Sequence, residues 1–221
     1  MQKFDTTAPI TAVLDIPGGR VQFIAADRAD TTVEVRPADA SKGRDVRAAE
    51  QTKVEYGDGV LRIETSAKNH QLLGPTGSLE VTVKLPADSR IEAKAAATEV
   101  RAIGRLGDVA FKGAYNQIKI DEAASVHLTA VSGDVEVGRL NGPAEISTSK
   151  GDIRIAEAVS GTVVLRTEMG DVSVSAAPGV SASLDAGTGS GRISNGLKND
   201  GTTELDIHAT TGYGDISARS L

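Results

Sequence analysis

Three aspartates that each follow a glycine have the type and spacing that could bind a metal ion. They are Asp134, Asp152 and Asp171, which lie 18 and 19 residues apart. If equivalent positions of a repeat stack on one another, these carboxylates stand about 5 Å apart and could share a divalent cation. The alternative is turn chemistry, in which glycine supplies an unusual φ angle and aspartate accepts hydrogen bonds from nearby backbone N–H groups. We expect the second role and no cofactor, because the Gly-Gly-x-Gly-x-Asp density of calcium-binding β-rolls is missing.

Acidic residues could also cleave a polysaccharide, as they do in some β-helix enzymes. Glu145, Asp152 and Asp171 are the candidates for that role. Such sites usually gather arginine, lysine and aromatic side chains in a groove, whereas the residues around this set are small and mixed. The chain also has no cysteine and no Gly-x-Ser-x-Gly nucleophile motif. We therefore predict no catalytic residue and a protein that is not an enzyme.

The element that must position these residues is a repeat of about eighteen residues. Gly-Asp followed by valine or isoleucine recurs through the second half, and Gly191-Arg192 takes the same place with its charge reversed. The repeat glycines are Gly133, Gly151, Gly170, Gly191 and Gly214. Each repeat holds two apolar positions nine residues apart, at Ile91/Val100, Val109/Ile118, Val126/Val135, Ala144/Ile153, Val163/Val172, Leu184/Ile193 and Ile207/Ile216. Successive repeats begin 18, 17, 18, 19, 21 and 23 residues apart.

Alternating apolar and polar residues within each repeat predict β-strands. One repeat cannot bury its own apolar face, so the repeats must stack into parallel sheets around a shared core. We predict an all-β protein, a parallel β-solenoid or β-helix of about seven coils of 17–23 residues with an N-terminal β cap. The scarcity of aromatic residues, three Phe and three Tyr without Trp, suits a thin core. A β-sandwich is the alternative, but it does not explain the constant nine-residue offset.

The first part of the chain follows a different pattern. We predict that residues 1–88 form a β cap continuous with the solenoid of residues 89–221, as one structural unit. Within the cap we expect an early coil, a strand, a loop or one short helix, a hairpin, a mobile loop and a further strand, at residues 10–25, 32–36, 38–52, 53–64, 66–78 and 78–85 respectively. Such a cap would shield the edge of the first coil.

Stacking turns each repeat position into a row along the protein. In sequence order the Asp row runs Glu99, Gln117, Asp134, Asp152, Asp171, Arg192 and Asp215. A second, inward row of small and hydroxyl residues, which we expect to be a structural ladder, runs Ala95, Gly113, Ala130, Thr148, Thr167, Thr188 and Thr211. His127 and His208 share an outward position. If the repeats stack in sequence order, the two histidines lie four coil steps apart, which is too far to share a metal ion.

Composition limits the partners and the compartment. The net charge is −6 with acidic and basic residues interspersed, so no basic stripe for nucleic acid is expected. The chain shows neither a signal-peptide pattern nor the ~20 apolar residues of a membrane span. We therefore expect a cytoplasmic protein that binds neither nucleic acid nor membrane.

The repeats resemble a known bacterial family. Thr129-Ala-Val-Ser-Gly-Asp-Val135, Thr148-Ser-Lys-Gly-Asp-Ile153 and Thr167-Glu-Met-Gly-Asp-Val172 are similar to the iterated Thr-Ala-Ser-Gly-Asp-Val of β-strand-repeat proteins that carry an adhesin label. The opening segment from Val13 to Phe23 resembles that family as well. The resemblance implies a β-solenoid without established catalytic residues.

Two non-catalytic functions follow from these patterns. The first is an adhesin-like scaffold or binding module whose repeated faces meet a protein or glycan partner. The second is a self-associating structural protein that polymerises through its ends. For the second we expect the C-terminal edge, with Leu205, Ile207 and Ile216, to offer unpaired strands for a homo-oligomer.

Overall fold

The computed structural model describes residues 1–65 and 77–221 as an all-β chain with one short helix. The elements are β1 (Gln2–Asp5), β2 (Thr11–Ile16), β3 (Gly19–Ala26), β4 (Asp30–Pro37), α1 (Gly43–Gln51), β5 (Thr52–Gly57), β6 (Val60–Thr65), β7 (Leu79–Pro86), β8 (Arg90–Ser132), β9 (Asp134–Leu140), β10 (Ala144–Lys150), β11 (Ile153–Ala158), β12 (Gly161–Met169), β13 (Val172–Ala176), β14 (Ala182–Ser190), β15 (Ile193–Gly196), β16 (Leu205–Tyr213) and β17 (Ile216–Ser220). Among the described residues, no helix has the length and apolar character that a membrane crossing requires.

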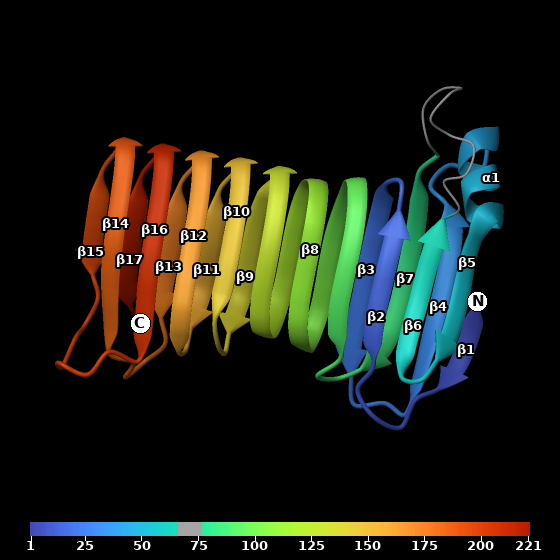
Figure 1. Cartoon of the computed structure of the whole chain (residues 1–221), viewed down its shortest axis with the longest axis horizontal. Helices are drawn as coiled ribbons and strands as arrows, with labels where there is room; N and C mark the ends of the chain where they lie inside the picture. Colours follow the sequence, from blue (N-terminus) through green and yellow to red (C-terminus); the bar gives the residue numbers. More distant parts are fainter. Residues whose placement is uncertain (66–76) are drawn as a thin grey trace.

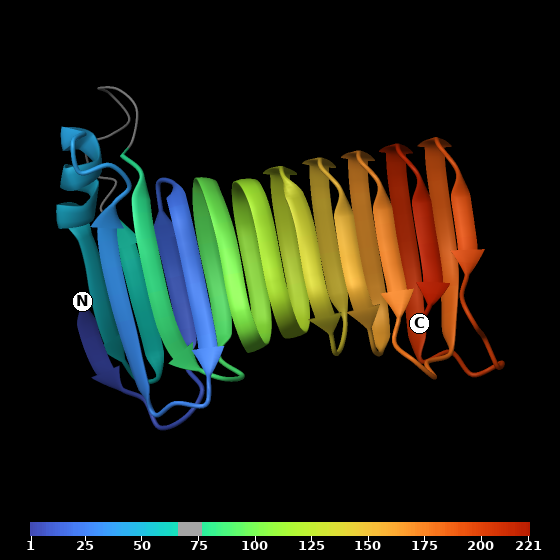
Figure 2. The same ribbon diagram turned by 180° about the vertical axis from the view of Figure 1, so that it is seen from behind.

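The strands stand side by side along the long axis in two layers (Figures 1 and 2). They form one continuous sheet, and the long strand β8 passes from one layer to the other. β10 pairs in parallel with β8 and β12, and β11 pairs in parallel with β9 and β13. The predicted all-β class with a mostly parallel sheet is therefore confirmed.

The pairing register aligns like residues of successive repeats. Ile146 lies opposite Leu128 on one side and Leu165 on the other, 18 and 19 residues away in sequence. All three are at most 1% exposed. Because side chains alternate between the two faces of a strand, this register buries every second residue in one core between the layers. Valine, isoleucine, leucine and alanine dominate that core, as the composition predicted.

The last strands of the chain do not lie at the end of the stack. β16 pairs with both β12 and β14, and β17 pairs with both β13 and β15. The prediction that Leu205, Ile207 and Ile216 form the edge is therefore wrong, because all three are at most 1% exposed. The segment between β15 and β16, residues 197–204, is long enough for the chain to return past β14 before it pairs.

A similar insertion occurs near the N-terminus. β2 lies between β6 and β8, and β3 lies between β7 and β8. Residues 10–25, predicted as an early coil, thus contain two strands with parallel pairing, but these strands are not the first in the stack. Beyond it, β1 pairs antiparallel with β4, β4 with β7, and β5 with β6.

Most other predictions for this part of the chain are confirmed. The hairpin at 53–64 turns through Asp58 and Gly59, which both have positive φ angles of 51° and 74°. Such a pair suits the tight turn that joins two antiparallel strands. Of the two possibilities for residues 38–52, the structure contains the short helix, α1. The predicted mobile loop at 66–78 falls outside the described residues except for its last two.

The repeat glycines bring the corners of successive repeats into close contact. Their φ angles lie between 119° and 153°, in a range that other residues rarely adopt. An added Cβ at Gly170 would stand 2.1 Å from the carbonyl oxygen of Gly151, and one at Gly214 would stand 2.1 Å from that of Gly170. Only glycine fits at these corners, both for its backbone conformation and for the space it leaves.

We predict that Gly170→Ala lowers the free energy of unfolding by about 2–4 kcal/mol, because strain and a steric clash add. Gly57→Ala is the matched control, since no atom lies within 4 Å of its added Cβ and its φ angle is not in the positive range. We expect it to change stability by about 0.5 kcal/mol or less. Urea unfolding of both variants measures the difference, and equal effects would contradict this account of the corner.

Candidate binding groove

The aspartates considered as candidate metal ligands form a hydrogen-bonded ladder at the corner of the stack. Each carboxylate accepts a hydrogen bond from the backbone N–H of the equivalent residue in the next repeat. Oδ1 of Asp134, Asp152, Asp171 and Asp215 accepts from the N–H of Asp152, Asp171, Asp215 and Arg192 at 2.9, 2.8, 2.7 and 2.8 Å respectively. These bonds are the turn chemistry that the motif predicted as its alternative to metal binding. Within the described residues, no group of three or more His, Cys, Asp or Glu side chains is arranged to hold a metal ion.

Arg192 ends this ladder rather than interrupting it. Sequence order placed it between Asp171 and Asp215, and this order is wrong because β15 lies outside β17. Among the described strands no further repeat follows β15, so no backbone N–H is there to donate to a carboxylate at this position. Arg192 instead donates from its backbone N–H and from its guanidinium to Asp215, at 2.8 and 3.2 Å. Both bonds favour the charged carboxylate and lower the pKa of Asp215.

The threonine row forms a second ladder just inside the first. Thr167 Oγ1 donates to the carbonyl oxygen of Gly151 at 3.1 Å, and Thr211 Oγ1 donates to that of Gly170 at 2.9 Å. Thr188 Oγ1 repeats the contact with Gly214 at 2.9 Å. Each hydroxyl thus binds the corner of the neighbouring repeat. The Thr-x-x-Gly-Asp spacing therefore has a structural explanation.

The structure separates Glu145 from the other two candidate catalytic acids. Glu145 lies on the outward face of β10, near His127 of β8 and Arg166 of β12, each at 3.5 Å. Asp152 and Asp171 lie just beyond the ends of β10 and β12, where they belong to the corner ladder. Seven residues of extended chain separate Glu145 from Asp152, which places them more than about 15 Å apart along the strand. Asp152 and Asp171 do stand next to each other, but there the carboxylate of each accepts a hydrogen bond from the backbone N–H of the next repeat.

His208 lies in an electrostatic cluster on the same outward face. It is three pairing steps from His127, through Glu145 and Val164, and not the predicted four, because β16 follows β12 directly. Its Nε2 is 2.9 Å from Asp206 and its Nδ1 is 3.5 Å from Asp185. The hydrogen bond to Asp206 is the main reason that the pKa of His208 is raised above 6.5.

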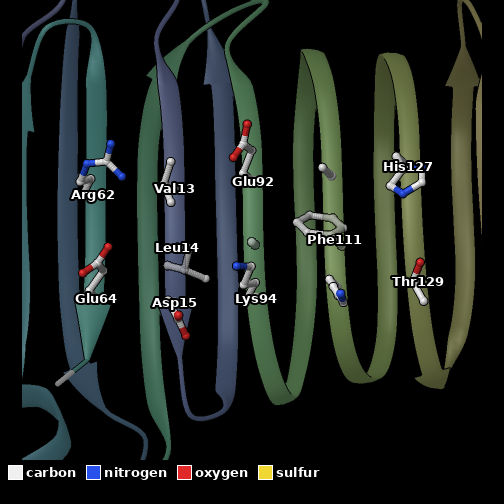
Figure 3. A pocket seen from close by; sticks show the side chains of 13 residues that line it. Val13, Leu14, Asp15, Arg62, Glu64, Glu92, Lys94, Phe111, His127 and Thr129 are labelled. Atoms are coloured by element: carbon white, nitrogen blue, oxygen red, sulfur yellow. The ribbon is translucent and has the colours of Figure 1, made fainter. Parts of the chain in front are cut away.

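A groove that the sequence did not reveal lies on the outward face of β6, β2 and β8 (Figure 3). It has a volume of about 510 Å³. Its side chains lie in two rows that cross the strands. Val13 is paired with Arg62 and Glu92 in the first row, and Asp15 is paired with Glu64 and Lys94 in the second. His127 and Thr129 continue these rows along the stack.

Short residues form the floor of this groove. Val13 and Ala110 lie in the first row, where longer side chains would fill the space. The buried residues between the rows contribute their backbone, since Leu14, Ala93 and Phe111 are at most 4% exposed and point into the core. The long charged side chains of the two rows then rise around the hollow.

Most of the charges around the groove have no ion-pair partner. Within the described part of the chain, no oppositely charged atom lies within 4.0 Å of five of them, which are Asp15, Arg62, Glu64, Lys94 and Lys112. Glu92 is the exception, because it binds Arg90 at 2.9 Å. Farther along the same two rows the charges are paired, in the contacts of Glu145 and in that between His208 and Asp185.

The unpaired charges of the second row are segregated by sign, whereas Arg62 stands on β6 in the first row, beside the acidic half. Glu64 and Asp15 occupy neighbouring strands in the second row, and Lys94 follows on the next strand. Lys112 comes one repeat after Lys94, and the adjacent Gly113 stacks on Ala95. The row therefore has an acidic half and a basic half. This arrangement cannot be seen in the sequence, because β2 enters between β6 and β8 only in the folded chain.

The family of the chain agrees with this architecture. Residues 14–220 match the profile of the Toastrack DUF4097 family, so the chain belongs to that family. The resemblance to bacterial β-strand-repeat proteins with an adhesin label is thereby confirmed.

Several solved structures are similar over nearly their whole length. A proposed adhesin from Bacteroides fragilis is 10% identical, with a TM-score of 0.47 over 98% of this chain and 95% of that one. A proposed cell adhesion protein from Clostridium sporogenes is 12% identical, with a TM-score of 0.41 over 100% and 98%. A proposed adhesin from Parabacteroides distasonis is 13% identical, with a TM-score of 0.36 over 98% and 95%. A comparison with curated proteins finds no match.

We predict that Asp152→Ala lowers the free energy of unfolding by about 1 kcal/mol, because it leaves the N–H of Asp171 without its acceptor. Asp152→Asn keeps a side-chain oxygen and should cost less than half as much. Thermal unfolding of both variants, with and without calcium, checks the ladder. A calcium-dependent stabilisation of the parent protein that Asp152→Asn abolishes would instead assign a metal site.

The raised pKa of His208 predicts a pH-dependent contribution to stability. The protonated ring is favoured in the folded state, so its stabilisation is complete below pH 6.5 and is lost as the pH rises through the higher folded-state pKa. His208→Gln should therefore lower the melting temperature at pH 5.5 more than at pH 8.5. The effect should be small, because the side chain is 42% exposed. An equal effect at both pH values would contradict the pairing with Asp206.

Proposed function

We propose that this protein is a non-catalytic, adhesin-like binding module that holds a polypeptide partner in the groove on β6, β2 and β8. Its scaffold, in this proposal, is a parallel β-solenoid of about seven coils, in which residues 1–88 form a cap continuous with the coils of residues 89–221. The parallel pairing of residues 18 or 19 positions apart supports the solenoid. The separation of Glu145 from the other candidate acids supports a role without catalysis.

The set of unpaired charges around a hollow is the observation that carries this proposal. Charged side chains that lack partners remain available to a ligand, and a concave surface concentrates their field. The acidic pair Glu64 and Asp15 lies two strand spacings, or about 10 Å, from the basic pair Lys94 and Lys112. Three residues of an extended chain span the same distance. A peptide with one basic and one acidic residue three positions apart would therefore complement both halves.

This charge pattern favours a polypeptide over other partners. A neutral glycan would cover the five charges without neutralising them, and burial of an unpaired charge is costly. A nucleic acid would place its phosphates against Asp15 and Glu64, which repel them. A polypeptide can present both signs within a short segment, and its apolar residues can contact Val13 and Ala110.

Synthetic peptides provide the test. We expect an extended peptide with Lys and Glu three positions apart to bind more tightly than three others of equal length, which carry two Lys, two Glu or no charge at these positions. NMR titration should shift the amide resonances of β2 and the first part of β8. The affinity should fall as salt is added, since exposed charges are screened.

Charge reversal in the groove gives the matched control. We expect Lys94→Glu combined with Lys112→Glu to weaken binding of the mixed peptide by about tenfold or more. Lys150→Glu makes the same type of change at an exposed position at the end of β10, away from the groove, and should leave binding unchanged. Equal binding of the neutral peptide, or equal effects of the two sets of variants, would overturn the proposal.

A further inference from the structure

We propose that the free edge formed by β14 and β15 binds the same edge of a second copy of this chain, which joins two molecules about a two-fold axis. β14 pairs on one side with β16, and β15 pairs on one side with β17. Within residues 1–65 and 77–221, no strand pairs with their other side. Both strands lie at the end of the stack that is opposite to α1 (Figure 1). This proposal does not depend on the groove.

The core is incompletely sealed at this edge. Ile193 occupies the same core position as Ile216, with which it is paired, but it is 47% exposed whereas Ile216 is 1% exposed. Leu184 is half-buried, whereas its partner Ile207 is fully buried. Each of these residues lacks the neighbour that a further repeat would supply. Apolar core positions are thus left open to solvent, where a partner can cover them.

The opposite end of the stack differs, because its edge strands β1 and β5 each pair antiparallel with one neighbour. Phe4 of β1 and Tyr56 of β5 form a tilted ring contact with 5.4 Å between centroids, and both rings pack against the core. α1 adds Ala48, which is 5% exposed, to the same end. The edge of β14 and β15 ends parallel pairs, whereas β1 and β5 end antiparallel pairs, so the two ends of the molecule do not match for continuation as a filament. The surface that matches it is the identical edge of another molecule, and contact between identical surfaces produces a closed dimer.

The sequence of β14 suits antiparallel pairing with its own copy. Ser181, just before β14, accepts a hydrogen bond from the N–H of Leu205, so the odd-numbered residues of β14 direct their backbone groups toward β16. The even-numbered residues, among them Leu184 and Ala186, then direct theirs toward the free side, as Ala182 does when its N–H donates to the carbonyl oxygen of Lys198. Pairing centred on Ala186 would place Asp185 opposite Gly187 of the partner subunit. Glycine at this position avoids both a steric clash and a pair of like charges.

The charge of this edge also permits self-association. The residues from 182 to 203 contain two aspartates, one arginine and one lysine, so their net charge is zero, although the whole chain carries −6. Two such surfaces can approach without net repulsion. β14 and β15 contain no lysine and no proline, the residues that usually protect exposed edges from pairing.

Light scattering on a sizing column tests this proposal with the whole chain. We expect a concentration-dependent species of twice the 22.8 kDa chain mass. Ile193→Arg should weaken the dimer by about tenfold or more, because it places a charge where apolar contact is expected. Val131→Arg is the matched control, since Val131 is an exposed apolar residue (62%) away from the edge, and it should leave the dimer intact. Ala186→Pro removes an N–H on the free side and gives a second disruptive variant if Ile193→Arg fails to fold.

Three results would overturn the proposal. One is a monomer at every accessible concentration. Another is a dimer that resists both Ile193→Arg and Ala186→Pro while circular dichroism shows them folded, because the interface would then lie elsewhere. The third is growth into larger assemblies, since an interface between identical edges closes after two copies.

Discussion

The close contact between the corners of neighbouring repeats is the constraint on which the other features depend. At Gly151, Gly170 and Gly214 the backbone of one repeat rests against the carbonyl group of the next, without room for a Cβ atom. Threonine hydroxyls and aspartate carboxylates then join the same corners by hydrogen bonds. Because the corners are held in register, the strands between them pair residue for residue, and each core residue meets its equivalent. The apolar core is therefore a consequence of aligned corners as much as of apolar composition.

A fixed register also gives the outer surface its chemistry. Every outward position becomes part of a row, so single residues from distant parts of the chain stand about 5 Å apart. Where the rows run over β10, β12 and β16, acidic and basic side chains neutralise one another. Over β6, β2 and β8 the floor is low, and among the described residues five of the charges lack an ion-pair partner. In the second row there, acidic residues stand on β6 and β2 and basic residues on β8. The scaffold is uniform, and the difference between these two regions lies in the residues that it displays.

The two ends of the stack solve the problem of open strand edges differently. At one end the sheet changes to antiparallel pairing and ends in an aromatic contact between Phe4 and Tyr56, beside a helix. At the other end the parallel pairing ends at β14 and β15, and Ile193 of β15 remains exposed. The weaker motif of that repeat, with Arg192 in place of aspartate, fits its position, because no further N–H follows to be bound. An irregular repeat is thus explained by its place in the stack.

The sequence by itself determined the all-β class, the parallel pairing, the hairpin around Asp58 and the ladder role of the repeat aspartates. Each of these depends on local patterns: period-two alternation, a fixed offset of nine residues, and glycine at the corners. Only the tertiary structure decided the order of the repeats, because a strand edge accepts any compatible strand that the connecting loop can bring to it. That freedom placed β16 between β12 and β14, and β2 beside β6. It buried Leu205, Ile207 and Ile216, and it brought the charges of the groove together from segments that are distant in sequence.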